Sequence, residues 1–231
     1  MMELNLPFMF AALFRALAAA PVTINITAVS LLIATPLGFF LALCRIYRVR
    51  PLDTLAGIYI SFIRGTPMVL QILIVYSILP SFLNAFVRSL GLGIDIFSLP
   101  PIIYAWTVFS LNSAAGLSEI FRSALLTVDR GQMEAARALG MSTAFAYRLV
   151  ILPQAFVSAL PNLSNFTVTL IKNTSLAFIM TVRDITAVAR IEAARGYNYI
   201  EAYLDIFLLY IALCGVVQWL FNRAEKKLSK R

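Results

Sequence analysis

A run of polar side chains interrupts one of the most apolar regions of the chain. Its members are Asn162, Asn165, Thr169, Lys172 and Asn173. At 100° per residue these positions fall within about a third of the circumference of a helix. A polar stripe in an apolar helix is expected to face protein or a water-filled cavity rather than lipid. There, Lys172 could pair with a carboxylate and the amides could supply hydrogen bonds.

Two other interpretations of this stripe stay open. Asn and Thr often hydrogen-bond between neighbouring helices, so the stripe could instead join this helix to another subunit. The long side chain of Lys172 could also extend its ammonium group towards the outer headgroups of a membrane.

A second candidate site is the tetrapeptide Arg64, Gly65, Thr66 and Pro67. Because Pro67 has no N–H to donate, a helix that runs through it is predicted to kink or unwind. A discontinuous helix frees backbone groups that could hold a substrate or act as the hinge of a gate. The alternative is that Arg64 is only an interfacial charge near the cytoplasmic end of its helix.

No catalytic or metal-binding pattern accompanies these residues. The sequence contains no histidine and no GxxxxGK[ST] phosphate-binding loop. Its two cysteines, Cys44 and Cys214, lie in separate apolar stretches, where small buried hydrophobes are the favoured interpretation over a disulfide or a metal site. We therefore expect no enzyme activity, no metal site and no cofactor in this chain.

Composition places these candidates in a membrane. Hydrophobic residues make up 61% of the 231 positions and charged residues 13%, and the mean hydropathy is +0.86. A soluble domain needs more polar side chains than this to cover its surface. The sequence thus predicts an all-α integral membrane protein with a single domain over residues 1–231.

Five apolar stretches are long enough to cross a bilayer, which takes about 20 residues in a helix. Their approximate bounds are 22–44, 55–79, 101–118, 154–180 and 203–221. Residues 6–20 are too short and carry Arg15, so we expect an interfacial helix there. Residues 81–99 are predicted to form a loop against the membrane surface, and residues 183–201 a polar connector.

The distribution of basic residues predicts how the chain is oriented in the membrane. Cytoplasmic loops carry an excess of Lys and Arg. One set of loops holds Arg45, Arg48, Arg50, Arg122, Arg130, Arg137, Arg148, Arg223, Lys226, Lys227, Lys230 and Arg231, whereas the other holds Arg15, Arg88, Arg183, Arg190 and Arg195. The prediction is an outer N-terminus and a cytoplasmic C-terminus. The net charge of +8 is then mostly a topology signal, and nucleic acid is not an expected partner.

The longest charge-bearing segment, residues 128–153, falls on the cytoplasmic side between the third and fourth spans. It is predicted to form an elbow of two short helices, 132–139 and 143–149. Gly140 suits the position just past a helix end, and Ser142 can cap the second helix. Pro153 is expected to lie beyond the end of that helix. Such an amphipathic elbow could dock into a groove of a partner, although a solvated loop is the alternative.

The spacing within this elbow resembles the EAA loop of bacterial ABC-importer permeases. Glu134, Ala135 and Ala136 are followed by Gly140 and then by Ile-Leu-Pro at 151–153. The surrounding words GQMEAARALG and VILPQA, with FIRGTP at 62–67 and LIKNTSL at 170–176, are similar to the polar-amino-acid branch of that family. The resemblance spans roughly residues 20–215. A second EAAR at 192–195 lacks the later glycine and proline and falls on the predicted outer side.

This resemblance implies the transmembrane subunit of a type I importer in a bacterial cytoplasmic membrane. In it Glu134, Ala135, Ala136, Gly140 and Pro153 would form the coupling helix that seats in a cytoplasmic ATPase. The implied partners are a dimer of ATPase subunits that binds ATP and Mg, a second permease of identical or homologous sequence, an extracellular or periplasmic amino-acid-binding protein, and membrane lipid. The implied cargo is a polar amino acid, and L-cystine is our leading hypothesis.

A secondary transporter driven by an ion gradient, or a channel subunit, is the main rival. A secondary transporter would favour inverted repeats and carboxylates at membrane depth. The central parts of the predicted spans contain no Asp or Glu. A channel or a membrane-bound enzyme lacks any recognisable site. The sequence alone does not select the amino acid that is carried, nor a homodimer over a heterodimer.

Overall fold

The computed structural model describes residues 4–228, and within them every regular element is a helix. The α-helices are α1 Leu6–Ala18, α2 Ala20–Ile46, α3 Leu52–Gly65, α4 Met68–Ser89, α5 Pro101–Leu126, α6 Arg130–Ala138, α7 Thr143–Ala146, α8 Leu152–Thr174, α9 Ile185–Ala194 and α10 Tyr199–Leu228. Two 3₁₀ segments, Ile96–Ser98 and Ser175–Met180, and a π-helical segment, Tyr147–Ile151, complete the set.

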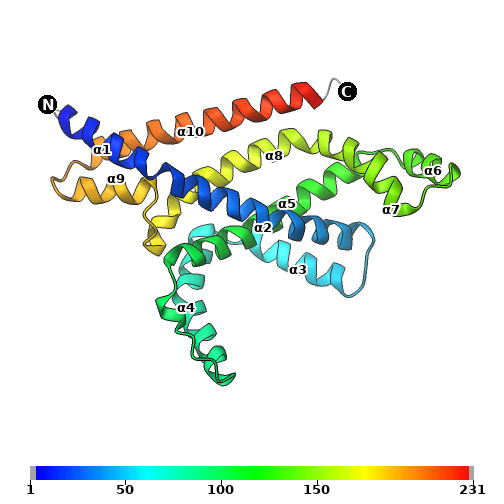
Figure 1. The fold of residues 1–231 in the computed structure, drawn as a ribbon, viewed down its shortest axis with the longest axis horizontal. Helices are drawn as coiled ribbons and strands as arrows, with labels where there is room; N and C mark the ends of the chain where they lie inside the picture. The colour runs from blue at the N-terminus through cyan, green and yellow to red at the C-terminus, as the bar shows by residue number, and fades with distance from the viewer. Residues whose placement is uncertain (1–3, 229–231) are drawn as a thin grey trace.

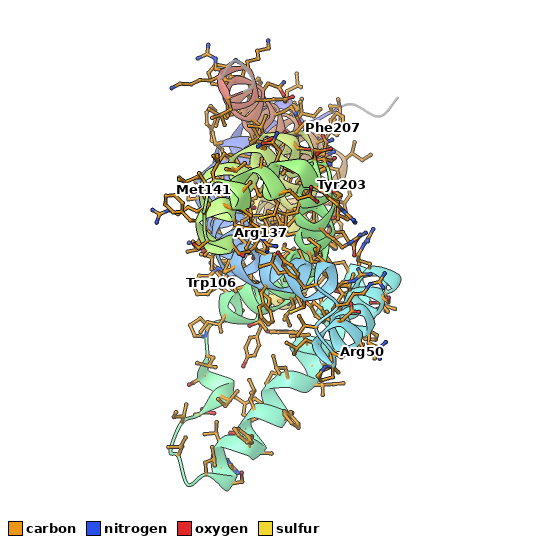
Figure 2. The ribbon with its side chains drawn as sticks, turned by 90° about the vertical axis from the view of Figure 1, so that its right-hand side faces the viewer. Arg50, Trp106, Arg137, Met141, Tyr203 and Phe207 are labelled. Carbon is orange, nitrogen blue, oxygen red and sulfur yellow. The ribbon has the colours of Figure 1, made fainter. Side chains whose placement is uncertain are left out.

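The helices α1, α2, α5, α8 and α10 lie roughly along the longest axis of the molecule, whereas α4 leaves it (Figure 1). The continuous line of α1 and α2 runs beside α8 and α10, with α5 behind it. The α9 helix lies at one end of this bundle, and α6 and α7 lie at the other. The α4 helix departs across the axis and projects from the body in both views (Figures 1 and 2).

Small side chains let α5 pack closely at the centre of the bundle. Ala105, Ala114 and Ala115 on α5 are fully buried. A Cβ added at Gly38 of α2 would lie 3.0 Å from the Ala114 carbonyl oxygen, so the two helices touch through backbone atoms. Close approach through small residues is the usual way in which helices associate in membranes, where no hydrophobic force drives them together.

Four helical segments of the described chain are long and apolar enough to cross a membrane: 6–46, 68–89, 143–180 and 199–228. The 26 residues of α5 are also long enough, at about 1.5 Å per residue. The α5 helix, which carries Asn112, Glu119 and Arg122, is nevertheless not one of these four segments. The count of five spans therefore stays a prediction.

Two regions differ from the sequence-based expectation. The predicted loop at 81–99 is helical as far as Ser89, because α4 continues through Pro80. A proline removes one helical hydrogen bond, but apolar side chains on either side still favour a helix in an apolar setting. A helix is present within residues 6–20 as α1, but Ala19 alone separates it from α2, and Ala12 and Ala16 are buried in the structure. Its interfacial position stays a prediction.

Candidate functional site

The polypeptide breaks its helix at Thr66 and Pro67, where both residues are extended. The α3 helix ends at Gly65 and α4 begins at Met68, so the interruption predicted from Pro67 is present. Gln71 of α4 satisfies the backbone that the break exposes. Its amide nitrogen donates to the Ile63 carbonyl at 2.7 Å and to the Thr66 hydroxyl at 2.8 Å, while its amide oxygen accepts from Asn112 of α5 at 2.9 Å.

A cavity of about 620 Å³ opens beside this break. The end of α3 supplies Ile63 and Arg64, the break supplies Thr66, and α8 contributes Phe166 and Asn173. The remaining wall comes from one face of α5 and the start of α4: Met68, Asn112, Gly116, Glu119, Ile120 and Ser123. Groups of both charges and several hydrogen-bonding groups therefore face one space, as a small zwitterion would require.

Among the described residues that line this cavity, Glu119 is the only acidic one. Its carboxylate forms an ion pair with Arg122, one turn further along α5, at 2.8 Å, and a second pair with Arg45 from the end of α2. Because the three side chains are only partly exposed, water screens these pairs less than it would at an open surface. The α2 and α5 helices are thus joined by charge beside the cavity.

The structure divides the predicted polar stripe of α8. Asn173 lines the cavity at the helix break, whereas Lys172 lines a separate groove against α10, with Tyr210, Cys214 and Gln218. The other residues of the stripe, Asn162, Asn165 and Thr169, are exposed on the surface of the chain. Lys172 and the cavity beside Arg64 are therefore not brought together in one site.

The predicted elbow residues form two short helices that meet at Gly140. Asp129 caps α6 by accepting from the Gly131 N–H at 2.7 Å. Gly140 has a φ of +79°, and the N–H groups of Gly140 and Met141 donate back to the carbonyls of Arg137 and Ala136. This is the hydrogen-bond pattern of a helix that ends on a left-handed residue, a conformation that glycine adopts without a steric cost.

One expectation for the elbow is wrong. Pro153 does not terminate the second helix. After the four residues of α7, the chain continues through the π-helical segment Tyr147–Ile151 directly into α8, and Pro153 lies in the first turn of α8. A proline is tolerated in a first turn, where its N–H is not needed, and the wider π turn accommodates the change in hydrogen bonding.

Hydrogen bonds hold the elbow to the rest of the molecule. Within it, Arg137 donates to the Thr143 hydroxyl at 3.2 Å. At its base, the Tyr147 hydroxyl pairs with that of Tyr47, which caps the end of α2, at 2.6 Å. Figure 2 looks onto this end of the molecule and shows Arg137 and Met141 there. Ala136 is buried against this scaffold, whereas Glu134, Ala135 and Gly140 are exposed.

The second EAAR sequence lies at the opposite end of the bundle, in α9. Glu192 pairs there with Arg15 of α1 and, at 3.0 Å, with Arg195. Its surroundings therefore differ from those of Glu134, which makes no ion pair with another residue of the 4–228 range.

Sequence reasoning did not identify Gln71, Asn112 or Glu119 as site residues. A signal for each was available, since all three are polar or charged residues within or at the edge of long apolar stretches. Such residues in membrane helices generally face protein or water. What the sequence lacked was the position of α5, which brings Asn112 and Glu119 to the break beside Gln71 of α4.

Comparison with known proteins agrees with this architecture. The family described as "Binding-protein-dependent transport system inner membrane component" matches residues 34–230. The chain belongs to this family. The permease is 38% identical to the L-cystine transport system permease protein TcyL of Bacillus subtilis (strain 168), over 91% of the chain and 85% of that protein. It is 36% identical to the arginine transport system permease protein ArtQ of the same organism, over 90% of each.

Solved structures extend the likeness to the fold. The permease superimposes on a crystal structure of an amino acid ABC transporter with histidines with a TM-score of 0.80, at 29% identity, over 98% of this chain and 100% of the other. The methionine ABC transporter MetNI gives a TM-score of 0.69 at 18% identity, over 99% of each chain. The permease therefore has the fold of an ABC-transporter membrane subunit.

Proposed function

We propose that this permease is the transmembrane subunit of an ATP-driven importer that carries a polar amino acid across the bacterial cytoplasmic membrane. The observation that carries the proposal is the cavity at the break between α3 and α4. It has about 620 Å³ of space and is lined by Arg64, Glu119, Asn112 and Asn173. Broken helices with polar linings near the middle of the bilayer are typical binding sites of transport proteins.

The lining residues match the two charged groups that all α-amino acids share. Arg64 presents a guanidinium suited to a carboxylate. Glu119 presents a carboxylate that would accept from an ammonium group in exchange for one of its ion pairs with Arg45 and Arg122. Asn112 and Asn173 can both donate and accept hydrogen bonds, so they suit a polar side chain. Thr66, Gly65 and Pro67 would act as the hinge that opens or closes this site.

The assignment of the substrate carboxylate can be tested with two neutral variants. Arg64→Gln removes the cation that lines the cavity, and Lys172→Gln removes the cation of the stripe, which lies in the groove against α10. We expect Arg64→Gln to raise the KM for uptake at least tenfold, and Lys172→Gln to raise it less than twofold. A larger increase in KM for Lys172→Gln than for Arg64→Gln would instead mean that Lys172 binds the substrate carboxylate, which is the role that the sequence suggested for it.

We further propose that the elbow at 128–153 is the coupling element that docks into the ATPase. Glu134, Ala135 and Gly140 are exposed there, beside Leu139, whose side chain is 78% exposed. The motif residues are therefore accessible to a partner, as a coupling role requires. Glu134→Lys should uncouple ATP hydrolysis from transport without loss of the protein from the membrane. Normal uptake by this variant would contradict the coupling role.

The proposed topology has five spans, an outer N-terminus and a cytoplasmic C-terminus. The elements would be α2, the broken pair of α3 and α4, α5, α8 with its 3₁₀ extension, and α10. The elbow and the basic end of α10 lie at one end of the bundle, and this end would face the cytoplasm under the positive-inside rule. A dimer of ATPase subunits would bind there, and an amino-acid-binding protein would deliver cargo at the α9 end.

L-cystine is the cargo that we propose first, because one of the relatives named above is an L-cystine permease. The test is uptake of labelled cystine in cells with and without this permease, with arginine, glutamine and histidine measured alongside. Selective loss of cystine uptake would support the assignment. Selective loss of another amino acid would correct the cargo and leave the importer intact.

The rival mechanism, a carrier or channel that uses an ion gradient, predicts a different energy source. Cellular ATP can be depleted while the ion gradient is maintained. We expect uptake to collapse under these conditions, since the energy would come from the partner ATPase. Uptake that continues without ATP would favour the rival.

A further inference from the structure

A second large cavity lies on the other side of α5 from the polar cavity. It has a volume of about 680 Å³ and is formed by α2, α5, the π-helical segment and α8. Its lining includes Pro36, Phe39, Phe121, Leu125, Phe156 and Leu163. Apart from Thr35, the single polar lining residue is Arg148. We call this cavity the apolar groove.

The two cavities use opposite faces of α5. Gly116, Glu119 and Ser123 line the polar cavity, whereas Phe121 and Leu125 line the apolar groove. At 100° per residue these two sets lie on opposing sides of the helix. The apolar groove is therefore separate from the proposed substrate path, and its chemistry would not suit a polar amino acid.

The lining of the groove favours an apolar occupant. Small residues form its floor, since Ala124, Ala155 and Ala159 are nearly fully buried. Aromatic side chains form its walls, where the rings of Phe39 and Phe121 meet edge to face at 6.0 Å. The groove is open to the surroundings, as the 51% exposure of Phe156 indicates. A protein surface that is concave and apolar within a bilayer is filled by acyl chains.

The charge at the end of the groove selects the headgroup. Arg148 forms no ion pair with any residue between positions 4 and 228. It belongs to the set of basic residues that the positive-inside rule places at the cytoplasmic surface. Anionic lipids of the cytoplasmic leaflet attract such residues, and a guanidinium binds phosphate oxygens in a forked geometry.

We infer that the apolar groove binds an acyl chain of an anionic phospholipid, with its phosphate held by Arg148. This inference rests on the proposed orientation of the chain but not on its cargo. The consequence concerns coupling, because Arg148 is part of the π-helical segment that joins the elbow to α8. A bound lipid would brace this junction, so the rate of ATP-driven transport should depend on anionic lipid.

The test measures lipid binding directly, without transport. The full-length permease is placed in nanodiscs that contain equal amounts of phosphatidylglycerol and phosphatidylcholine with the same acyl chains. It is then extracted in mild detergent, and the retained lipids are counted by native mass spectrometry. We expect wild type to prefer phosphatidylglycerol, and Arg148→Gln to reduce that preference about fivefold, as loss of one interfacial cation predicts.

Three further variants make the result specific to the groove. Arg148→Lys keeps the charge and should retain most of the preference. Ala155→Leu fills the floor of the groove and should reduce retention of both lipids. Lys226→Gln removes a cation from the last turn of α10, at the same end of the molecule but outside the groove, and should change nothing.

Two outcomes would overturn the inference. Equal losses in Arg148→Gln and Lys226→Gln would mean that surface charge alone attracts the lipid. An oligomer that dissociates in Ala155→Leu, with lipid retention unchanged, would mean that the groove holds a second polypeptide. Because no step requires cargo or ATP, a failed transport assignment would leave this binding result intact.

Discussion

Gln71 holds the break between α3 and α4 together with a single side chain. It donates to the Ile63 carbonyl and the Thr66 hydroxyl, and it accepts from Asn112. Gln71→Leu has a similar volume but leaves these partly buried groups without their partner. We expect the free energy of unfolding to fall by about 1–3 kcal/mol, measured by denaturant titration in detergent.

Gln154→Leu provides the matched control for this prediction. Gln154 also donates to a backbone carbonyl, that of Val150 at 2.9 Å, but it is exposed on α8. Its substitution should change stability by less than about 0.5 kcal/mol. Equal effects of the two leucine variants would show that Gln71 has no special role at the break.

Asp184 makes stability depend on pH. Its carboxylate accepts from the Ala187 N–H at 2.8 Å and caps α9, but burial raises its pKa from 3.8 to about 6. Because the folded state holds this proton more tightly than the unfolded state does, the stabilising contribution is complete below about pH 4. This contribution is lost as the pH rises to about 6. The difference between the pKa of Asp184 in the unfolded state, 3.8, and in the folded state, about 6, corresponds to roughly 3 kcal/mol.

Asp184→Asn removes this titration while it keeps an oxygen for the helix cap. The difference in melting temperature between wild type and Asp184→Asn should therefore change steadily between pH 4 and 6, in the direction that favours the variant at higher pH. Melting curves in detergent across this range provide the measurement. Parallel pH profiles for the two proteins would show that Asp184 keeps an ordinary pKa.

Among the elements, the turn of the elbow depends on Gly140. A Cβ added there would meet no atom within 4 Å, so a substitution acts only through the φ of +79°. Gly140→Ala should destabilise the turn by about 1–2 kcal/mol, whereas Gly140→Asn should cost less because Asn tolerates this conformation. We expect coupled ATP hydrolysis to follow the same order, wild type above Asn and Asn above Ala. Equal activity of all three would separate coupling from the shape of this turn.

The elements also show what the sequence could and could not predict. The Gly140 turn, the break before Pro67 and the first apolar helix followed from local chemistry, since glycine, proline and apolar length act within a few residues. The continuation of α4 through Pro80 and the position of Pro153 did not, because a proline only limits where hydrogen bonds form. The separation of Lys172 from Asn173 depends on where α10 packs, which is a long-range property.

At the scale of the whole molecule, a single chain exposes both polar and apolar surfaces that a partner subunit would have to cover. Asn162, Asn165 and Thr169 are exposed on α8, and the projecting α4 exposes Leu73, Ile74, Ile78 and Phe82. Lipid cannot satisfy the amides. Two copies, or two related permeases, could enclose the α8 stripes in one water-filled path, while α4 reaches across the neighbouring subunit.

This arrangement predicts which surface water can reach. The background for this test lacks Cys44 and Cys214, both of which are buried and free. In it, Asn165→Cys should react readily with a membrane-impermeant maleimide. With a short bismaleimide, the same variant should give a cross-linked dimer. Leu32→Cys, on the exposed apolar face of the spanning helix α2, should react at least tenfold more slowly, because a lipid-facing thiol is seldom ionised. Equal, slow labelling at both positions would place the α8 stripe against lipid. Rapid labelling at Asn165→Cys without a cross-linked dimer would instead mean that water reaches the stripe in a single subunit. The partner permease would then have to contact this chain through α4 alone.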